Sequence, residues 1–374
     1  MKESVNQDVT LEQEQNLLDF DLVGLKAFFL ENGEKAFRAP QLSKWIYQRG
    51  VINFDEMTDF SKSLREKLTK ISVIQVPEIV VDQVSNDGTR KWLLKLQDGN
   101  CIETVFIPGP SRGTLCISSQ VGCILNCSFC STAKQGFNRN LSTAEIIGQL
   151  WVAAKMLGQY DNDNKRIITN VVMMGMGEPL LNLDAVIRAL SLMKEDNAFG
   201  LSGRRVTVST AGVIPAMDEL SQRINVSLAV SLHATNDTLR DKLVPLNKKY
   251  PIDQLIEACN RYVNAGLKRH ITFEYILIDG VNDGIEDANA LCKLLKGMPA
   301  KVNLIPFNPY PNTEYRTSSI GAQNVFSEIL IDKGLITVTR RTRGEDIDAA
   351  CGQLAGKIHD KTNRSFRLKN VAGV

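Results

Sequence analysis

The feature that most constrains the fold is an alternation of strand and helix patterns from Gly113 onward. Near-continuous apolar strands that alternate with helices are typical of a parallel sheet covered by helices on both faces, or of a sheet curled into a barrel. We therefore predict an α/β fold, a partial (six-stranded) parallel β/α barrel, with its chemistry in the loops at the carboxyl ends of the strands. The six expected strands are residues 114–118, 170–174, 205–210, 225–232, 271–278 and 301–306.

Before this alternation, the sequence predicts a small helical domain and a β meander. Residues 21–70 carry apolar side chains at helical spacing. Three extended runs at 78–84, 90–96 and 101–107 are separated by turn sequences rich in Asn, Asp and Gly. The Pro and Gly residues at 108–110 suggest a domain boundary. The expected parts are a flexible acidic leader at 1–20, the helical domain with the meander at 21–108, the core barrel at 109–345 and a C-terminal segment at 346–374.

Charge and composition indicate which kinds of partner and which cellular compartment to expect for this protein. Lys and Arg total 44 against 42 Asp and Glu, so a polyanion site must be a local patch, such as the basic stretch from residue 337 to the end. The first 20 residues lack the pattern of a secretory signal, and no apolar run approaches the ~18 residues needed to cross a membrane. We therefore expect a cytoplasmic protein without membrane contact. Where its eight cysteines cluster, we expect metal ligands or catalytic thiols rather than a disulfide framework.

Cys123, Cys127 and Cys130 form a C-x3-C-x2-C motif directly after the first expected barrel strand. A structural zinc site normally has four protein ligands, and this loop offers no obvious fourth Cys or His. A cubane iron–sulfur cluster tolerates three thiolates if one iron keeps an open position for another ligand. The alternatives are a zinc knuckle or three buried thiols.

This motif in this position resembles the radical S-adenosylmethionine (radical SAM) superfamily. The resemblance implies a 4Fe-4S cluster on Cys123, Cys127 and Cys130, whose open iron binds S-adenosylmethionine (SAM) and cleaves it to a 5′-deoxyadenosyl radical. By the same resemblance, Gly177 and Glu178, in the turn after the second strand, contact the methionyl amine of SAM. Without it, they would be an ordinary strand-to-helix turn.

Further polar residues fall at the expected ends of later strands. Ser209 lies at the end of the third strand, the run Ser231-Leu232-His233 lies at the end of the fourth, and Asn308 comes just after the sixth. Each has a simple structural interpretation as a turn residue or a buried histidine. Their position at the catalytic rim favours SAM binding, with Asn308 on the adenosine part.

The resemblance narrows to the RlmN family of dual-specificity RNA methyltransferases, and it covers essentially the whole chain beyond the leader. The segments that carry it are residues 113–122, 123–130, 131–141, 173–179, 228–233, 305–309 and 342–354. It implies methylation of C2 of an adenosine in the peptidyl-transferase region of 23S rRNA and of the adenosine 3′ of the anticodon in certain tRNAs. This chemistry consumes two SAM molecules per turnover.

The family pattern assigns three catalytic residues. Cys351 is methylated first, a radical formed on its S-methyl group adds to adenine C2, and a covalent protein–RNA adduct results. Glu103 then removes the C2 proton, and Cys116 attacks Cys351 to form a transient disulfide that releases the product. Without the resemblance, Cys116 would be a small buried residue, Glu103 a solvated strand residue and Cys351 an ordinary helical thiol. The remaining thiols, Cys101, Cys259 and Cys292, are expected to be structural.

The expected partners are 23S rRNA, tRNA and a one-electron reductant such as flavodoxin, and the expected state is a monomer. Candidate phosphate contacts, whose alternative is solvated helix faces, lie in the helical domain and the tail. They are Lys35, Arg38, Lys44, Arg49, Arg364, Arg367 and Lys369.

Three alternative functions stay open. The nearest is a related resistance methyltransferase that modifies C8 of the same rRNA adenosine. C2 is favoured because the N-terminal helices and the runs at 135–140 and 342–354 are closer to RlmN. The others are a zinc-knuckle RNA-binding protein, which would be colourless, and an electron-transfer protein, which would need no pair of thiols such as Cys116 and Cys351.

Overall fold

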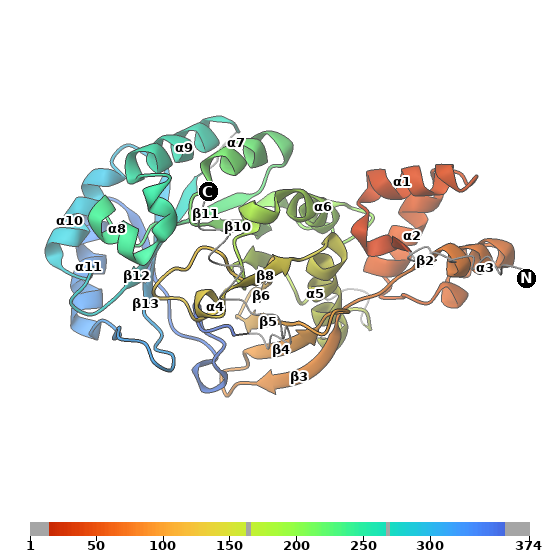
Figure 1. Ribbon diagram of the computed structural model, residues 1–374, viewed down its shortest axis with the longest axis horizontal. Helices are drawn as coiled ribbons and strands as arrows, with labels where there is room; N and C mark the ends of the chain where they lie inside the picture. Colours follow the sequence, from red (N-terminus) through yellow and green to blue (C-terminus); the bar gives the residue numbers. More distant parts are fainter. Residues whose placement is uncertain (1–14, 162–165, 267–269, 356–374) are drawn as a thin grey trace, which may run out of the picture.

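The computed structural model, which describes residues 15–161, 166–266 and 270–355, is built on one ten-stranded sheet (Figure 1). Its strands follow the order β14-β13-β12-β11-β10-β9-β6-β5-β4-β3. The seven strands from β6 to β14 are parallel to one another, which confirms a partial parallel β/α barrel. The expected number of six was one too low, because β14 extends the sheet beside β13. They are β6 Gly113–Cys116, β9 Asn170–Met173, β10 Val206–Thr210, β11 Ser227–Ser231, β12 Ile271–Leu277, β13 Ala300–Pro306 and β14 Ile336–Thr339.

The meander belongs to this same sheet. Its strands are β3 Glu78–Val84, β4 Arg90–Lys95 and β5 Cys101–Pro108. Strand β5 pairs antiparallel with β6, with Pro108 opposite Gly113. The expected boundary between 108 and 109 therefore falls inside a hairpin. A hairpin turn and a domain linker use the same residue types, so the sequence did not distinguish them.

Helices connect successive parallel strands and cover the sheet (Figure 1). Strand residues such as Val208, Leu228 and Phe273 are fully buried, as expected for strands packed on both faces. Helix α5 begins with a capping box in which Ser142 and Glu145 satisfy each other's backbone amides. The helices of the barrel region are α4 Ser131–Lys134, α5 Thr143–Met156, α6 Leu183–Lys194, α7 Ile214–Arg223, α8 Asp237–Leu243, α9 Ile252–Asn264, α10 Ile285–Leu294 and α11 Ile320–Asp332.

The helical domain lies at one end of the molecule beside α5 and α6 (Figure 1). It contains α1 Leu22–Glu31, α2 Arg38–Tyr47 and α3 Lys62–Ile71, and the indole of Trp151 on α5 donates to the Ile46 carbonyl at 2.8 Å. The flexible leader predicted for residues 1–20 extends too far along the chain. Residues 15–19 already form structure, and Leu17 and Leu18 are fully buried, because this apolar pair within an acidic stretch packs into the core. Residues 1–14 of that leader lie outside the described residues.

Several short elements complete the described chain. Strands β7 and β8 flank the cysteine motif and pair antiparallel with each other, whereas β1 and β2 pair in parallel. Their bounds, with those of the 3-10 helices, are β1 Gln15–Asn16, β2 Ser72–Val73, β7 Gln120–Gly122, β8 Phe137–Asn140, η1 Leu17–Asp19, η2 Phe54–Glu56, η3 Pro179–Asn182, η4 Gly203–Arg205, η5 Pro245–Lys248 and η6 Glu345–Ile347.

Two further observations bear on the expectations from sequence. Within the described ranges, none of the helices combines the length and the apolar character that a membrane span requires. All eight cysteines fall in these ranges, and none of them is joined in a disulfide bond there, so the transient disulfide stays a prediction.

Candidate active site

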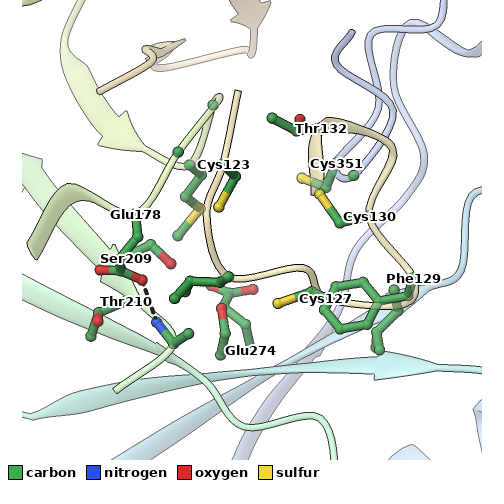
Figure 2. A pocket seen from close by; sticks show the side chains of 18 of the residues that line it. Cys123, Cys127, Phe129, Cys130, Thr132, Glu178, Ser209, Thr210, Glu274 and Cys351 are labelled. Carbon is green, nitrogen blue, oxygen red and sulfur yellow. Dashed lines mark hydrogen bonds between the residues drawn. The ribbon is translucent and has the colours of Figure 1, made fainter. Parts of the chain in front are cut away.

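A cavity lies where β9 to β13 end, at the carboxyl edge that the sequence predicted for the chemistry (Figure 2). In Figure 2, Glu178, Ser209 and Thr210 line one side of it, and Cys130 and Cys351 lie on the other. The residues that line it are Cys123, Leu125, Cys127, Phe129, Cys130, Thr132, Met173, Met174, Gly175, Gly177, Glu178, Pro179, Ser209, Thr210, Ala211, Ser231, His233, Glu274, Ile276, Ile305, Arg340, Cys351 and Gly352.

All three motif cysteines line this cavity, spread from Cys123 to Cys130 in Figure 2. Burial raises the pKa of Cys123 to about 12 and also raises the pKa values of Cys127 and Cys130. Mutual repulsion adds to the rise at Cys127, because both other thiols lie near it. Three buried thiolates therefore need a positively charged centre to hold them in the charged form.

The donor set fits a cluster better than a single ion. Across the described ranges, no three His, Cys, Asp or Glu side chains are grouped closely enough to hold one metal ion. A cubane binds each thiolate through a different iron, so its ligands stand farther apart than the ligands of one zinc ion. This arrangement favours the iron–sulfur interpretation of the motif over the zinc knuckle.

Contacts from distant elements hold the cysteine loop in place. The Ser128 amide donates to the Leu243 carbonyl at 3.1 Å, and the Tyr310 hydroxyl donates to the Ser128 carbonyl at 3.0 Å. The ring of Phe129 packs edge-on against His233, with ring centroids 4.6 Å apart. The loop is therefore positioned by both the β11 and the β13 ends of the sheet.

Glu178 supplies a buried carboxylate on the side of the cavity across from Cys130 and Cys351 (Figure 2). Its oxygens accept from the backbone amides of Ala211 at 2.8 Å and Leu180 at 3.1 Å. Burial nevertheless raises its pKa to about 7. No cationic side chain of the described residues forms a salt bridge with it. An ammonium group bound in the cavity, such as the methionyl amine of SAM, would supply the missing positive charge.

Gly177 has a backbone that another residue would strain. Its φ is +94°, and a Cβ there would lie 2.4 Å from the Cβ of Gln120. The side chain of Gln120 in turn accepts from the Glu178 amide at 2.9 Å. Adding a methyl group therefore disturbs the residue that fixes the position of Glu178.

Gly177→Ala is expected to weaken SAM binding by about tenfold or more, since positive-φ strain alone costs ~1–3 kcal/mol and the contact with Gln120 adds to it. Equilibrium dialysis of cluster-loaded protein with labelled SAM measures this. Gly297→Ala is the matched control, because Gly297 also has positive φ, at +84°, but its Cβ would meet nothing within 4 Å. Equal SAM affinities in the two variants would contradict the assignment of this turn to SAM.

The other expected SAM contacts divide into two groups. Ser209, Ser231 and His233 line the cavity, whereas Leu232 is fully buried beside it. His233 accepts from the Ile276 amide at 3.1 Å through Nδ1, and burial lowers its pKa to about 3, so the ring is neutral. Asn308 does not line the cavity and contacts the C-terminal segment instead.

The Cys351 segment folds back onto the sheet. Asn308 Nδ2 donates to the Cys351 carbonyl at 3.2 Å and Asn308 Oδ1 accepts from the Thr342 hydroxyl at 3.1 Å. Cys351 lies in a turn that follows a 3-10 helix rather than in an α-helix. The structure thus places Asn308 as a support for the Cys351 turn.

Cys116 and Glu103 lie behind this segment. Cys116 is buried at the end of β6. Its pKa is raised to about 12, mainly by burial and to a smaller extent by repulsion from the nearby Cys351. Glu103 is buried rather than solvated. Lys91 Nζ lies 3.2 Å from one of its oxygens, and the Ala355 amide donates to the other at 2.7 Å. Cys116 and Glu103 therefore both lie against the chain segment that carries Cys351.

Sequence reasoning missed three residues that organise the site. Arg340 and Glu274 line the cavity and contact each other at 3.0 Å. Arg240, 1% exposed, donates to the carbonyls of Ala211, Ser231 and Leu232 and so joins two loops of the rim. Glu274 did carry a signal, because an acidic residue inside an otherwise apolar strand is unusual.

Comparisons with known proteins agree with this geometry. Residues 15–74 match the ribosomal RNA large subunit methyltransferase (RlmN) N-terminal domain, and residues 117–292 match the radical SAM superfamily. A radical SAM methyltransferase from Sphaerobacter thermophilus is 42% identical, with a TM-score of 0.85, over 91% of this chain and 99% of that one.

Two other solved structures are much less similar. A domain of the pyruvate-formate lyase-activating enzyme from Bacteroides vulgatus is 22% identical, with a TM-score of 0.36, over 46% of this chain and 99% of that one. Streptococcus suis SuiB bound to S-adenosylmethionine is 12% identical, with a TM-score of 0.44, over 62% of this chain and 54% of that one. The two domain matches and the full-length similarity to the Sphaerobacter enzyme show that the chain belongs to the radical SAM methyltransferases of the RlmN family.

Proposed function

We propose that this protein methylates C2 of adenosine in 23S rRNA and in tRNA, with Cys351 as the carrier of the methyl group. The observation that carries the proposal is the position of Cys351, which lines the same cavity as the motif cysteines and lies beside Cys130 and across from Glu178. The carbon C2 of adenine is electrophilic and has no lone pair, so direct displacement on SAM cannot methylate it. A carrier thiol beside a radical centre provides another route.

The residues of the cavity fit the two groups that this route needs. Cys123, Cys127 and Cys130 would hold a 4Fe-4S cluster, and Glu178 would pair with the ammonium of SAM. When bound together, the cluster and SAM would supply one-electron cleavage of a sulfur–carbon bond, with the electron delivered by a reductant such as flavodoxin. Ser209, Ser231 and the neutral His233 would line the remaining surface of the SAM site.

The protein's own groups perform the other steps. Cys351 accepts the methyl group as a thiolate and later presents it to the base. Glu103 takes the proton from C2 of the covalent adduct, and the adduct's one unpaired electron would return to the cluster when bound. Cys116 then bonds to the Cys351 sulfur as the sulfur–carbon bond to the RNA breaks. The electron pair of that bond remains with the departing base, whose carbon takes up a proton and becomes the methyl group. The burial of Glu103 and Cys116 behind the Cys351 segment supports these roles.

The helical domain supplies a candidate surface for RNA. Lys35 and Lys44 are exposed, whereas Arg38 and Arg49 are engaged with Phe60 and Trp45 in cation–π contacts. The match of this domain to an RlmN N-terminal domain supports an RNA-binding role. Arg364, Arg367 and Lys369 lie outside the described residues. The target base must leave its stack to reach the cavity.

Nucleoside mass spectrometry on unmodified 23S rRNA and tRNA tests the proposal. The RNA is incubated with anaerobically reconstituted protein, reductant and SAM. We expect new 2-methyladenosine in both RNAs. The appearance of 8-methyladenosine would contradict the regiochemistry, and the absence of any methylation by protein with an intact cluster would contradict the substrate assignment.

A further inference from the structure

Arg340 stands at a junction of three chemically different groups. Its guanidinium lies 3.0 Å from Glu274 Oε1, 3.6 Å from Cys351 Sγ and 3.7 Å from Met174 Sδ. The residue directly follows β14, and its backbone amide donates to the Leu304 carbonyl at 2.8 Å. The main chain of Arg340 is therefore fixed to the edge of the sheet, and its side chain extends across the cavity to Cys351.

Glu274 fixes the direction of this side chain. Its side chain is 4% exposed, it lies on strand β12, and Asn303 Nδ2 donates to the same Oε1 at 2.9 Å. Burial raises the pKa of Glu274, and the neighbouring Arg340 lowers it. A buried carboxylate is stable only beside a positive charge, so Glu274 and Arg340 hold each other in place. With Nη2 held by Glu274, Nη1 is left to donate to Cys351.

We propose that Arg340 is the positioning residue of the methyl carrier: its guanidinium, held by Glu274, donates to Cys351 Sγ and keeps this sulfur at the cavity, where it receives the methyl group. This inference rests on the proposed role of Cys351. In the transfer, the thiolate forms a bond to the methyl carbon of SAM, and the electron pair of the broken carbon–sulfur bond returns to the SAM sulfur. Neither an external electron nor a proton is needed.

The contact between Arg340 and Cys351 also explains how Cys351 can leave the guanidinium once it has been methylated. A charge-assisted hydrogen bond to a thiolate is strong, whereas a thioether is only a weak acceptor. Once Cys351 is methylated, its sulfur resembles that of Met174, which Arg340 already contacts. Methylation therefore weakens the hold on Cys351 and leaves the guanidinium paired with Glu274.

Two measurements on cluster-loaded protein without RNA test the inference. Peptide mapping after brief exposure to iodoacetamide gives the alkylation rate of Cys351 and does not depend on catalysis. Intact-mass analysis after incubation with SAM, without reductant, gives the maximal rate of Cys351 methylation and the KM for SAM. The variants are Arg340→Gln and Arg340→Lys, and the control is Arg341→Gln, which removes the same charge from an exposed neighbouring residue.

Arg340→Gln is expected to lower both Cys351 rates by about threefold to tenfold, because the sulfur loses the charge-assisted hydrogen bond that positions it. The higher intrinsic reactivity of a sulfur without this hydrogen bond offsets part of the loss. The KM for SAM should stay within about twofold. Arg340→Lys should recover part of the loss, and Arg341→Gln should match the unmodified protein.

Three outcomes would overturn the inference. They are unchanged rates in Arg340→Gln, a loss that Arg340→Lys does not relieve at all, and a raised KM with an unchanged maximal rate, which would place Arg340 on SAM itself. Failure of the unmodified protein to methylate Cys351 would contradict the proposed function instead. In that case the alkylation rates still decide whether Arg340 acts on this thiol.

Discussion

Replacement of Cys351 by alanine is expected to abolish RNA methylation while the cluster and the SAM site stay intact. Cys351 lies in the cavity wall but is separate from the C-x3-C-x2-C motif, so its loss removes the methyl carrier and leaves the expected cluster ligands. Because the carrier forms covalent bonds in the reaction, the expected loss is at least about 1,000-fold. Nucleoside mass spectrometry measures the product, and iron analysis measures the cluster.

Cys292→Ala is the matched control for this variant. Cys292 is also a half-buried free thiol, but it lies on α10 outside the cavity lining. We expect the control to retain full activity. If Cys351→Ala formed methylated adenosine at more than a trace level, Cys351 would not be the carrier. If it lost its iron, Cys351 would be a cluster ligand.

Cys116→Ala is expected to block the reaction at a later stage and to accumulate protein covalently joined to RNA. In the proposed mechanism, only the attack of Cys116 on the Cys351 sulfur breaks the bond to the RNA. The variant can therefore form the adduct but cannot resolve it. A denaturing gel with end-labelled RNA would show a slow band that needs SAM and reductant and disappears after protease treatment.

Removal of this buried sulfur atom should cost only ~1 kcal/mol of folding free energy, so the variant should fold. Cys101→Ala, which removes a buried thiol from the neighbouring strand β5, is the control and should give no such band. Normal product formation by Cys116→Ala would show that another group releases the RNA. Absence of both product and adduct would assign Cys116 to an earlier step.

The parallel part of the fold was predictable because its strands are buried on both faces and so form apolar runs. The same logic could not show that the meander joins this sheet, since the pairing of Pro108 with Gly113 depends on a turn that also resembles a linker. The position of Leu17 and Leu18 was hidden by the acidic residues around them, although the core buries both.

The candidate site was predictable where its residues are close in sequence. The three motif cysteines and the Gly177-Glu178 turn each follow a strand directly, so local pattern placed them at the cavity. The Arg340–Glu274 pair joins residues that are 66 positions apart and meets only because β12, β13 and β14 are neighbours. In the sequence, Arg340 was one of several basic residues near the C-terminus, and nothing there indicated its contact with a thiol.

A label on the methyl group tests the central claim, that Cys351 carries the methyl group to RNA. Cluster-loaded protein is first incubated with SAM that bears a trideuterated methyl group and is then freed of it. RNA, reductant and unlabelled SAM are added for a single turnover, and the adenosine product is weighed by mass spectrometry. We expect a methyl group with two deuterium atoms, because one leaves when the carrier's radical forms and a proton replaces it at release. A methyl group without deuterium would come directly from the second SAM and would contradict the role of Cys351.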